Sequence, residues 1–219
     1  MLEEGLFRLL EAVERLGLNL SVVAWLSIAA ATVVMGYVLR RVRQPRIWAA
    51  AAIVTAVALA GNLADYFVTL HRSPDLSWEA NPIWRNVIDA WGLRAAKWYG
   101  LSGKILVSIV AGQMWAFYLS NQKRLFPDNA RSLAEFLRRM GNRSETRGQR
   151  IVALFTLLSF FFAGVQLLYF YIAYLNWIED PELAGRLPSA PVAILILLLA
   201  LAAAFTAHAY RDFRSWEGR

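Results

Sequence analysis

The sequence predicts an all-α polytopic membrane protein: a bundle of five transmembrane helices, with an N-terminal amphipathic helix and short interfacial helices. Of the 219 residues, 58% are hydrophobic and the mean hydropathy is +0.41, which is too apolar for an ordinary soluble domain. The apolar residues fall into separate runs, each near or above the ~20 residues that cross the hydrocarbon core of a bilayer. Arginines gather between these runs, as they do in the loops of membrane proteins.

The first element, residues 2–18, has leucines at helical spacing on one face and charged residues on the other. This amphipathic helix is too polar to span a membrane, so we expect it to lie on the membrane surface or on the bundle. The five spans follow it and form one membrane domain over 1–219, interrupted by a basic loop at 121–150. The expected spans are about 19–39, 47–70, 98–120, 151–177 and 190–210.

The loops set the expected orientation. Loops 40–46 and 121–150 and the C-terminal tail are rich in arginine, and such loops lie on the cytoplasmic side. The N-terminal helix and loop 178–189 are acidic or nearly neutral. We therefore expect a prokaryotic cytoplasmic membrane protein with its N-terminus outside and its C-terminus inside. A helix near 129–140 would contact anionic lipid headgroups, which accounts for the +7 net charge without nucleic acid.

Small residues recur every four positions in the second and third spans, a spacing that lets two helices approach closely. We therefore expect these spans to be neighbours at the centre of the bundle. The fourth span ends in tyrosines and tryptophan, an aromatic belt typical of the membrane interface. The small residues are Ala52, Ala56, Ala60 and Ala64 in the second span and Ser108 and Gly112 in the third. The belt consists of Tyr169, Phe170, Tyr171, Tyr174 and Trp177.

Two charged residues lie inside these apolar runs, where an unpaired charge is costly. Asp65 and Lys104 each lie about five or six residues from the outer end of their spans, or roughly 8–9 Å deep. Because the spans run in opposite directions and are expected to touch, the two charges should pair. Asn62 and Thr69 share the face of Asp65, and Ser108 shares the face of Lys104. A purely structural pair that fixes helix register remains an open alternative.

The loop after the second span adds further polar residues. Asn81 followed by Pro82 favours a helix start, since Asn is a preferred N-cap and Pro a preferred first helical residue. We expect this helix to run to about Trp91, to end at Gly92 and to lie in the outer interface. Capping alone would also explain the Asn-Pro pair. The predicted ligand-binding residues, with no catalytic or metal-ligating residue among them, are Asn62, Asp65, Thr69, Glu79, Asn81, Lys104 and Ser108.

This arrangement resembles an uncharacterised family of small prokaryotic multi-span membrane proteins. The shared pattern is D-x-x-x-T at Asp65 to Thr69, E-x-N-P at Glu79 to Pro82, and Lys104 in the following span. It covers about residues 60–110. The resemblance supports the choice of these residues, but no established activity, cofactor or substrate comes with it.

Three function classes remain open. The favoured one is binding or translocation of a small solute, an ion or a lipid headgroup at a polar site on the extracytoplasmic side. The second is an accessory subunit of a larger membrane complex or of a homo-oligomer, which would use the alanine-rich faces. The third is a membrane-embedded hydrolase or transferase with Asp65 or Glu79 as general base. The absence of cysteine excludes disulfides, thiolate metal sites and cysteine nucleophiles.

A serine protease is not expected. The sequence Gly100-Leu101-Ser102-Gly103 resembles the G-x-S-G of rhomboid intramembrane proteases, but such a serine needs a histidine base. His208 is expected roughly 20 Å away in depth, near the inner end of the fifth span. His71 is expected at the outer end of the second span, so the two histidines do not suit one haem either.

Overall fold

The computed structural model describes residues 20–77, 82–140, 146–178 and 181–217. The expected N-terminal helix at 2–18 and the site residues Glu79 and Asn81 lie outside these ranges. Within them the chain is helical, and five segments are long and apolar enough to cross a membrane, which confirms the predicted transmembrane helical bundle. The elements are α2 (Leu20–Leu39), α3 (Pro45–Arg72), α4 (Pro82–Asn121), the 3₁₀ helix η1 (Gln122–Leu125), α5 (Leu133–Arg139), α6 (Arg147–Val165), α7 (Leu168–Trp177), α8 (Pro181–Arg186) and α9 (Ala190–Glu217).

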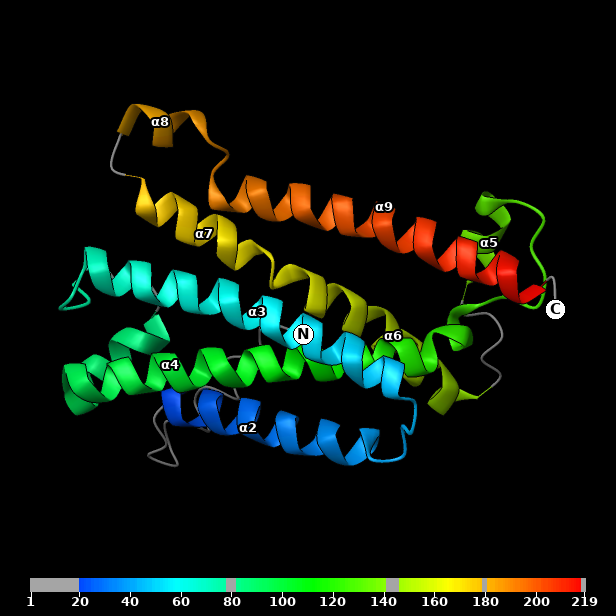
Figure 1. Cartoon of the computed structure of the whole chain (residues 1–219), viewed down its shortest axis with the longest axis horizontal. Helices are drawn as coiled ribbons and strands as arrows, with labels where there is room; N and C mark the ends of the chain where they lie inside the picture. Colours follow the sequence, from blue (N-terminus) through cyan, green and yellow to red (C-terminus); the bar gives the residue numbers. More distant parts are fainter. Residues whose placement is uncertain (1–19, 78–81, 141–145, 179–180, 218–219) are drawn as a thin grey trace.

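The spanning helices alternate in direction along the chain (Figure 1). The pair α3 and α4 forms the centre; α2 packs on α4, α7 on α3, α6 on α4, and α9 on α6 and α7. We call the end with residues 40–44, η1, α5 and the last turns of α9 the arginine end. The opposite end, where α3 stops at Arg72 and α7 stops at Trp177, is called the cavity end. Large apolar side chains such as Val33 on α2 and Leu199 on α9 are exposed, as expected of surfaces that face lipid.

The helix that begins at Pro82 ends at Gly92, as expected from the sequence. Gly92 has φ 80° and ψ 172°, a conformation that favours glycine because it has no Cβ. The chain kinks at this single residue and the membrane helix resumes at Leu93. The third span therefore begins earlier than the expected position 98, because no loop separates it from the interfacial helix.

Other boundaries differ from the expected ones because of capping. Thr146 and Gln149 form a capping box, so α6 begins at Arg147 and not at 151. Ser132 accepts the Glu135 N–H, so α5 begins after residue 132 and not near 129. The expected loop 178–189 contains the short α8, and the fifth span continues past 210 to Glu217.

The fourth span is interrupted at Gln166, between α6 and α7. Here the N–H groups of Leu167, Tyr169 and Phe170 bond to carbonyl oxygens three residues earlier, at 3.1–3.2 Å. This tighter, 3₁₀-like turn interrupts the α-helix within the fourth span. After this turn, α7 packs on α3 and places Asn176 beside Asp65 and Tyr169 beside Lys104.

The second and third spans, α3 and α4, are in contact as expected. The face of α3 that packs on α4 differs, however, from the face that the alanine spacing predicted. Ala52, Ala56 and Ala60 are exposed, whereas Ala51 and Ala58 are buried. The predicted packing face was therefore wrong for these three alanines, and the fourth, Ala64, is half-buried.

The rotation of α3 follows from its polar residues. Asn62 and Asp65 are buried on the same face as Ala51 and Ala58, and polar groups in a membrane helix turn toward the protein interior. On α4, Gly112 packs directly on this face: a Cβ there would lie 2.7 Å from the Ala51 carbonyl oxygen. The small residue expected at 112 is thus what lets the helices touch.

Aromatic side chains close the bundle at the arginine end. Phe136 is fully buried and anchors α5 to this aromatic core, while Leu133 and Leu137 on the same short helix remain exposed. Helix α5 therefore packs on the protein through Phe136, whereas Leu133 and Leu137 face away from it. The buried aromatic residues of this core are Tyr118, Phe126, Phe136, Phe160, Phe205 and Phe213.

Candidate functional site

Asp65 and Lys104 form the ion pair that the sequence predicted. The Lys104 Nζ lies 2.6 Å from Asp65 Oδ2, and the two side chains are only 14% and 11% exposed. The ammonium also lies 4.6 Å from the centroid of the Tyr169 ring, within the range of a cation–π contact. The second carboxylate oxygen, Asp65 Oδ1, accepts a hydrogen bond from Asn176 Nδ2 at 3.3 Å. Both oxygens of the carboxylate are therefore engaged within the protein.

The neighbouring polar residues support this pair in different ways. Asn62 is almost fully buried, and its Nδ2 donates to the Ala58 carbonyl at 2.9 Å and to Gln166 Oε1 at 3.2 Å. It thereby ties α3 to the break between α6 and α7. Ser108 is also buried, but its hydroxyl donates to the Lys104 carbonyl at 2.7 Å, so it holds its own helix turn.

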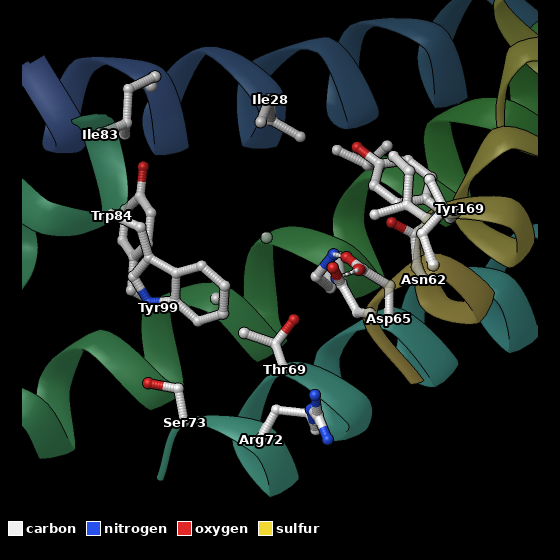
Figure 2. A pocket seen from close by; sticks show the side chains of 18 of the residues that line it. Ile28, Asn62, Asp65, Thr69, Arg72, Ser73, Ile83, Trp84, Tyr99 and Tyr169 are labelled. Carbon is white, nitrogen blue, oxygen red and sulfur yellow. Dashed lines mark hydrogen bonds and ion pairs between the residues drawn. The ribbon is translucent and has the colours of Figure 1, made fainter. Parts of the chain in front are cut away.

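The ion pair borders a cavity of about 660 Å³ formed by α2, α3, α4 and α7. Asn62, Asp65, Thr69 and Lys104 line it, whereas Ser108 does not. Figure 2 shows Trp84 and Tyr99 on one side of the cavity and Asn62, Asp65 and Tyr169 on the other, with Thr69 and Arg72 following along α3. The structure thus brings four of the expected residues to one cavity.

Aromatic residues of the cavity have their own polar partners. Trp84 Nε1 donates to the Ala96 carbonyl at 2.6 Å, and the Tyr99 hydroxyl donates to the Ser21 carbonyl at 3.0 Å. Trp25 Nε1 donates to Ser102 Oγ at 3.0 Å. Since these donors are used, the rings offer mainly apolar surface to a ligand.

The loop at the mouth is held by Asp75. Its Oδ1 accepts hydrogen bonds from the Ser77 N–H and from the Ser73 hydroxyl, both at 3.1 Å. The bond from the Ser77 backbone N–H has the largest effect on the carboxyl group of Asp75. Together the bonds hold the pKa of Asp75 below its usual range because they favour the ionised carboxylate. The turn after α3 therefore keeps its charge at neutral pH.

Sequence reasoning missed the contribution of α7. Tyr169 was assigned to the aromatic belt, yet its ring covers Lys104. Asn176 and Gln166 were not selected, although a lone amide inside an apolar span is a signal of a buried polar contact. Both make such contacts, with Asp65 and Asn62 respectively.

The protease and haem readings find no support in the geometry. Ser102 Oγ donates to the Tyr99 carbonyl at 3.1 Å and accepts from Trp25. His71 stacks on Trp177, and His208 lies at the arginine end, 3.3 Å from Asp212. Among the residues described, no three of the types His, Cys, Asp and Glu gather around a common point that would hold a metal ion.

Comparison of the chain with protein-family models, with curated proteins and with solved structures found no match. The resemblance over residues 60–110 therefore stays a hypothesis that rests on the motif residues themselves. The function has to be argued from the chemistry of the cavity.

Proposed function

We propose that this integral membrane protein binds or translocates a small solute, an ion or a lipid headgroup in the cavity at Asp65 and Lys104, on the extracytoplasmic side. The observation that carries the proposal is that the pair borders a cavity of about 660 Å³. Ligand sites in proteins have volumes of roughly 300–1,000 Å³ and combine apolar walls with a few polar groups. A pair that only fixed helix register would be stabilised by close packing around it, since empty space forfeits dispersion contacts.

Binding accounts for this site better than catalysis by the same residues. A general base needs a free lone pair aimed at substrate. Each oxygen of Asp65 has one lone pair engaged, by Lys104 and by Asn176, so a substrate proton would compete with two donors already in place. The other candidate base, Glu79, lies outside the described residues and adds no geometric support for a hydrolase or transferase.

A cavity-filling variant tests the proposal. Gly103 lines the cavity, and a Cβ added there would meet nothing within 4 Å. Gly103→Leu should therefore occupy ligand space without disturbing the packing or the ion pair. We expect small molecules identified by mass spectrometry in the purified wild-type protein to fall at least tenfold in Gly103→Leu, with an unchanged thermal midpoint.

The matched control is Ala52→Leu, which adds side-chain volume on the exposed face of α3. It should retain the wild-type ligand content. Equal content in Gly103→Leu and the wild type, or no bound molecule in either, would contradict the proposal.

The proposed orientation, in a prokaryotic cytoplasmic membrane, has the arginine end inside and the cavity end outside. The arginine-rich loops support it, because such loops stay on the cytoplasmic side. Arg138 and Arg139 on α5 would then contact anionic lipid headgroups at the inner surface.

Cysteine labelling tests this orientation, since the chain has no cysteine of its own. Ser77→Cys and Ser215→Cys place single thiols at exposed positions of the cavity end and the arginine end. In intact spheroplasts a membrane-impermeant maleimide should label Ser77→Cys, and should label Ser215→Cys only after permeabilisation. The reverse pattern would overturn the orientation.

An accessory-subunit role is the second candidate. Ala52, Ala56 and Ala60 form an exposed row of small residues on α3, the kind of surface on which another membrane helix packs closely. A stoichiometric protein partner in the same purification would favour this role.

A further inference from the structure

The Lys104 ammonium occupies a place that suits any primary ammonium. It donates to Asp65 Oδ2 at 2.6 Å and lies 4.6 Å from the centre of the Tyr169 ring. Asn176 fixes the other oxygen of the same carboxylate. A carboxylate beside an aromatic face is the pairing that recognises ammonium groups in general. Here the protein fills that place with its own side chain.

The pair is neutral as a whole, and this restricts what can replace it. A ligand with a single charge would take one member of the pair and leave the other charge without its partner, which is costly in a membrane interior. A ligand with both charges would exchange one ion pair for two. Its ammonium would take the position beside Asp65 and Tyr169, and Lys104 would turn to its anionic group.

The ligand ammonium must also be able to donate a hydrogen bond. The separation of 2.6 Å between Lys104 Nζ and Asp65 Oδ2 is a charge-assisted hydrogen bond. A quaternary ammonium has no N–H and would leave that oxygen without a donor. The site therefore favours an ammonium with N–H groups, such as a primary ammonium, over a quaternary one.

Away from the ion pair the wall of the cavity is partly apolar, with Thr69, Arg72 and Ser73 as polar residues on and after α3. Ile28 on α2 and Ile172 and Leu175 on α7 line it. The extensive packing contacts of α2 are with α4, and those of α7 are with α3. Apolar side chains of two helices that are packed on different partners thus line the same cavity. Apolar side chains of this kind suit the hydrocarbon chains of a lipid.

We propose that the ligand is a phospholipid with a phosphoethanolamine headgroup, a statement that rests on the ligand-binding function proposed above. Its ammonium replaces that of Lys104 at Asp65 and Tyr169, its phosphate pairs with Lys104, and its acyl chains pass between α2 and α7. The aromatic side chains of Trp25 and Trp84 contact the glycerol region.

Native mass spectrometry of the full-length protein in detergent tests the headgroup. The probes are phosphatidylethanolamine, phosphatidylcholine and phosphatidylglycerol with the same acyl chains, together with water-soluble phosphoethanolamine. We expect one molecule of phosphatidylethanolamine to bind at least tenfold more tightly than the other two lipids. Equal affinity for the three lipids would overturn the inference. Phosphoethanolamine that binds as tightly as the lipid would overturn the role of the acyl chains.

The double variant Asp65→Asn/Lys104→Met removes the exchangeable pair, and we expect it to lose the preference for phosphatidylethanolamine. The control is Asp89→Asn/Lys97→Met on α4, which makes the same charge changes outside the cavity lining and should retain the preference. Unchanged selectivity in the first double variant would overturn the inference.

The two proposals fail in different ways. A different co-purified molecule that is displaced by Gly103→Leu, without selective binding of phosphatidylethanolamine, would refute the lipid and leave the binding function standing. No bound molecule under any condition would refute both.

Discussion

Replacing either member of the Asp65–Lys104 pair will destabilise the protein, and replacing both will restore much of the lost stability. Both side chains are largely buried, at 11% and 14% exposure. Asp65→Asn leaves the Lys104 ammonium beside the Tyr169 ring without a negative charge to pair with, and Lys104→Met leaves the carboxylate with the Asn176 amide. Removing one partner of a buried pair costs ~3–5 kcal/mol, and the partial exposure of both side chains to the cavity places the expected cost toward ~3 kcal/mol.

Thermal midpoints of the two single variants and of Asp65→Asn/Lys104→Met, measured in one detergent, give the coupling energy of the pair. We expect the double variant to be more stable than either single variant, because no lone charge remains. The double variant Asp89→Asn/Lys97→Met serves as the charge-matched control and should unfold close to the wild type. Two harmless single variants, or effects that simply add, would mean that the pair contributes nothing to folding.

The ion pair could be predicted from the sequence because its depth is set by simple geometry. The apolar runs fix where each span begins and ends, and the helical rise converts sequence position into depth. The cost of a lone charge in the membrane then requires a partner at the same level, and Asp65 and Lys104 are at matching levels. The end of the interfacial helix at Gly92 was also predicted, since glycine is a common helix stop, but the immediate return to helix at Leu93 was not.

The α7 side of the cavity could not be predicted in the same way. Whether Tyr169 and Asn176 face Asp65 or the lipid depends on the rotation of α7 about its axis. That rotation is set by the tightened turn at Gln166, which contains no proline to mark it. Asn62 donates a hydrogen bond to Gln166, which lies 104 positions later in the chain. Local sequence patterns do not encode a contact between residues so far apart.

The face of α3 was missed because alanine is common on several sides of this helix. Alanine spacing alone allows more than one packing face. Ala51 is buried and Ala52 is exposed, yet the spacing of alanines fits either of them as the inward residue. The polar residues decide between the two faces, since Asn62 and Asp65 must point inward. Charge placement is thus a stronger guide to helix rotation here than the spacing of small residues.

The contact between α3 and α4 gives the other large expected effect: Gly112→Ala will destabilise the bundle. A Cβ at position 112 would lie 2.7 Å from the Ala51 carbonyl oxygen and would collide with the Thr55 side chain. The Ala51 carbonyl belongs to the helix backbone, so α3 itself would have to move away. Because Asp65 and Lys104 hold the same two helices together further along, such a shift strains the pair as well. Overpacking of this kind costs about 1–3 kcal/mol.

Gly103→Ala is the matched control, the same substitution on the same helix at a position where the new methyl group meets nothing within 4 Å. Its stability should be unchanged or higher by up to ~1 kcal/mol, since alanine favours helix more than glycine does. Thermal midpoints measured side by side compare the two variants directly. Adding Thr55→Ala to Gly112→Ala removes the side-chain collision but leaves the carbonyl contact, so it should recover only part of the loss. Equal midpoints for Gly112→Ala and Gly103→Ala would show that the two helices are not in close contact at this point.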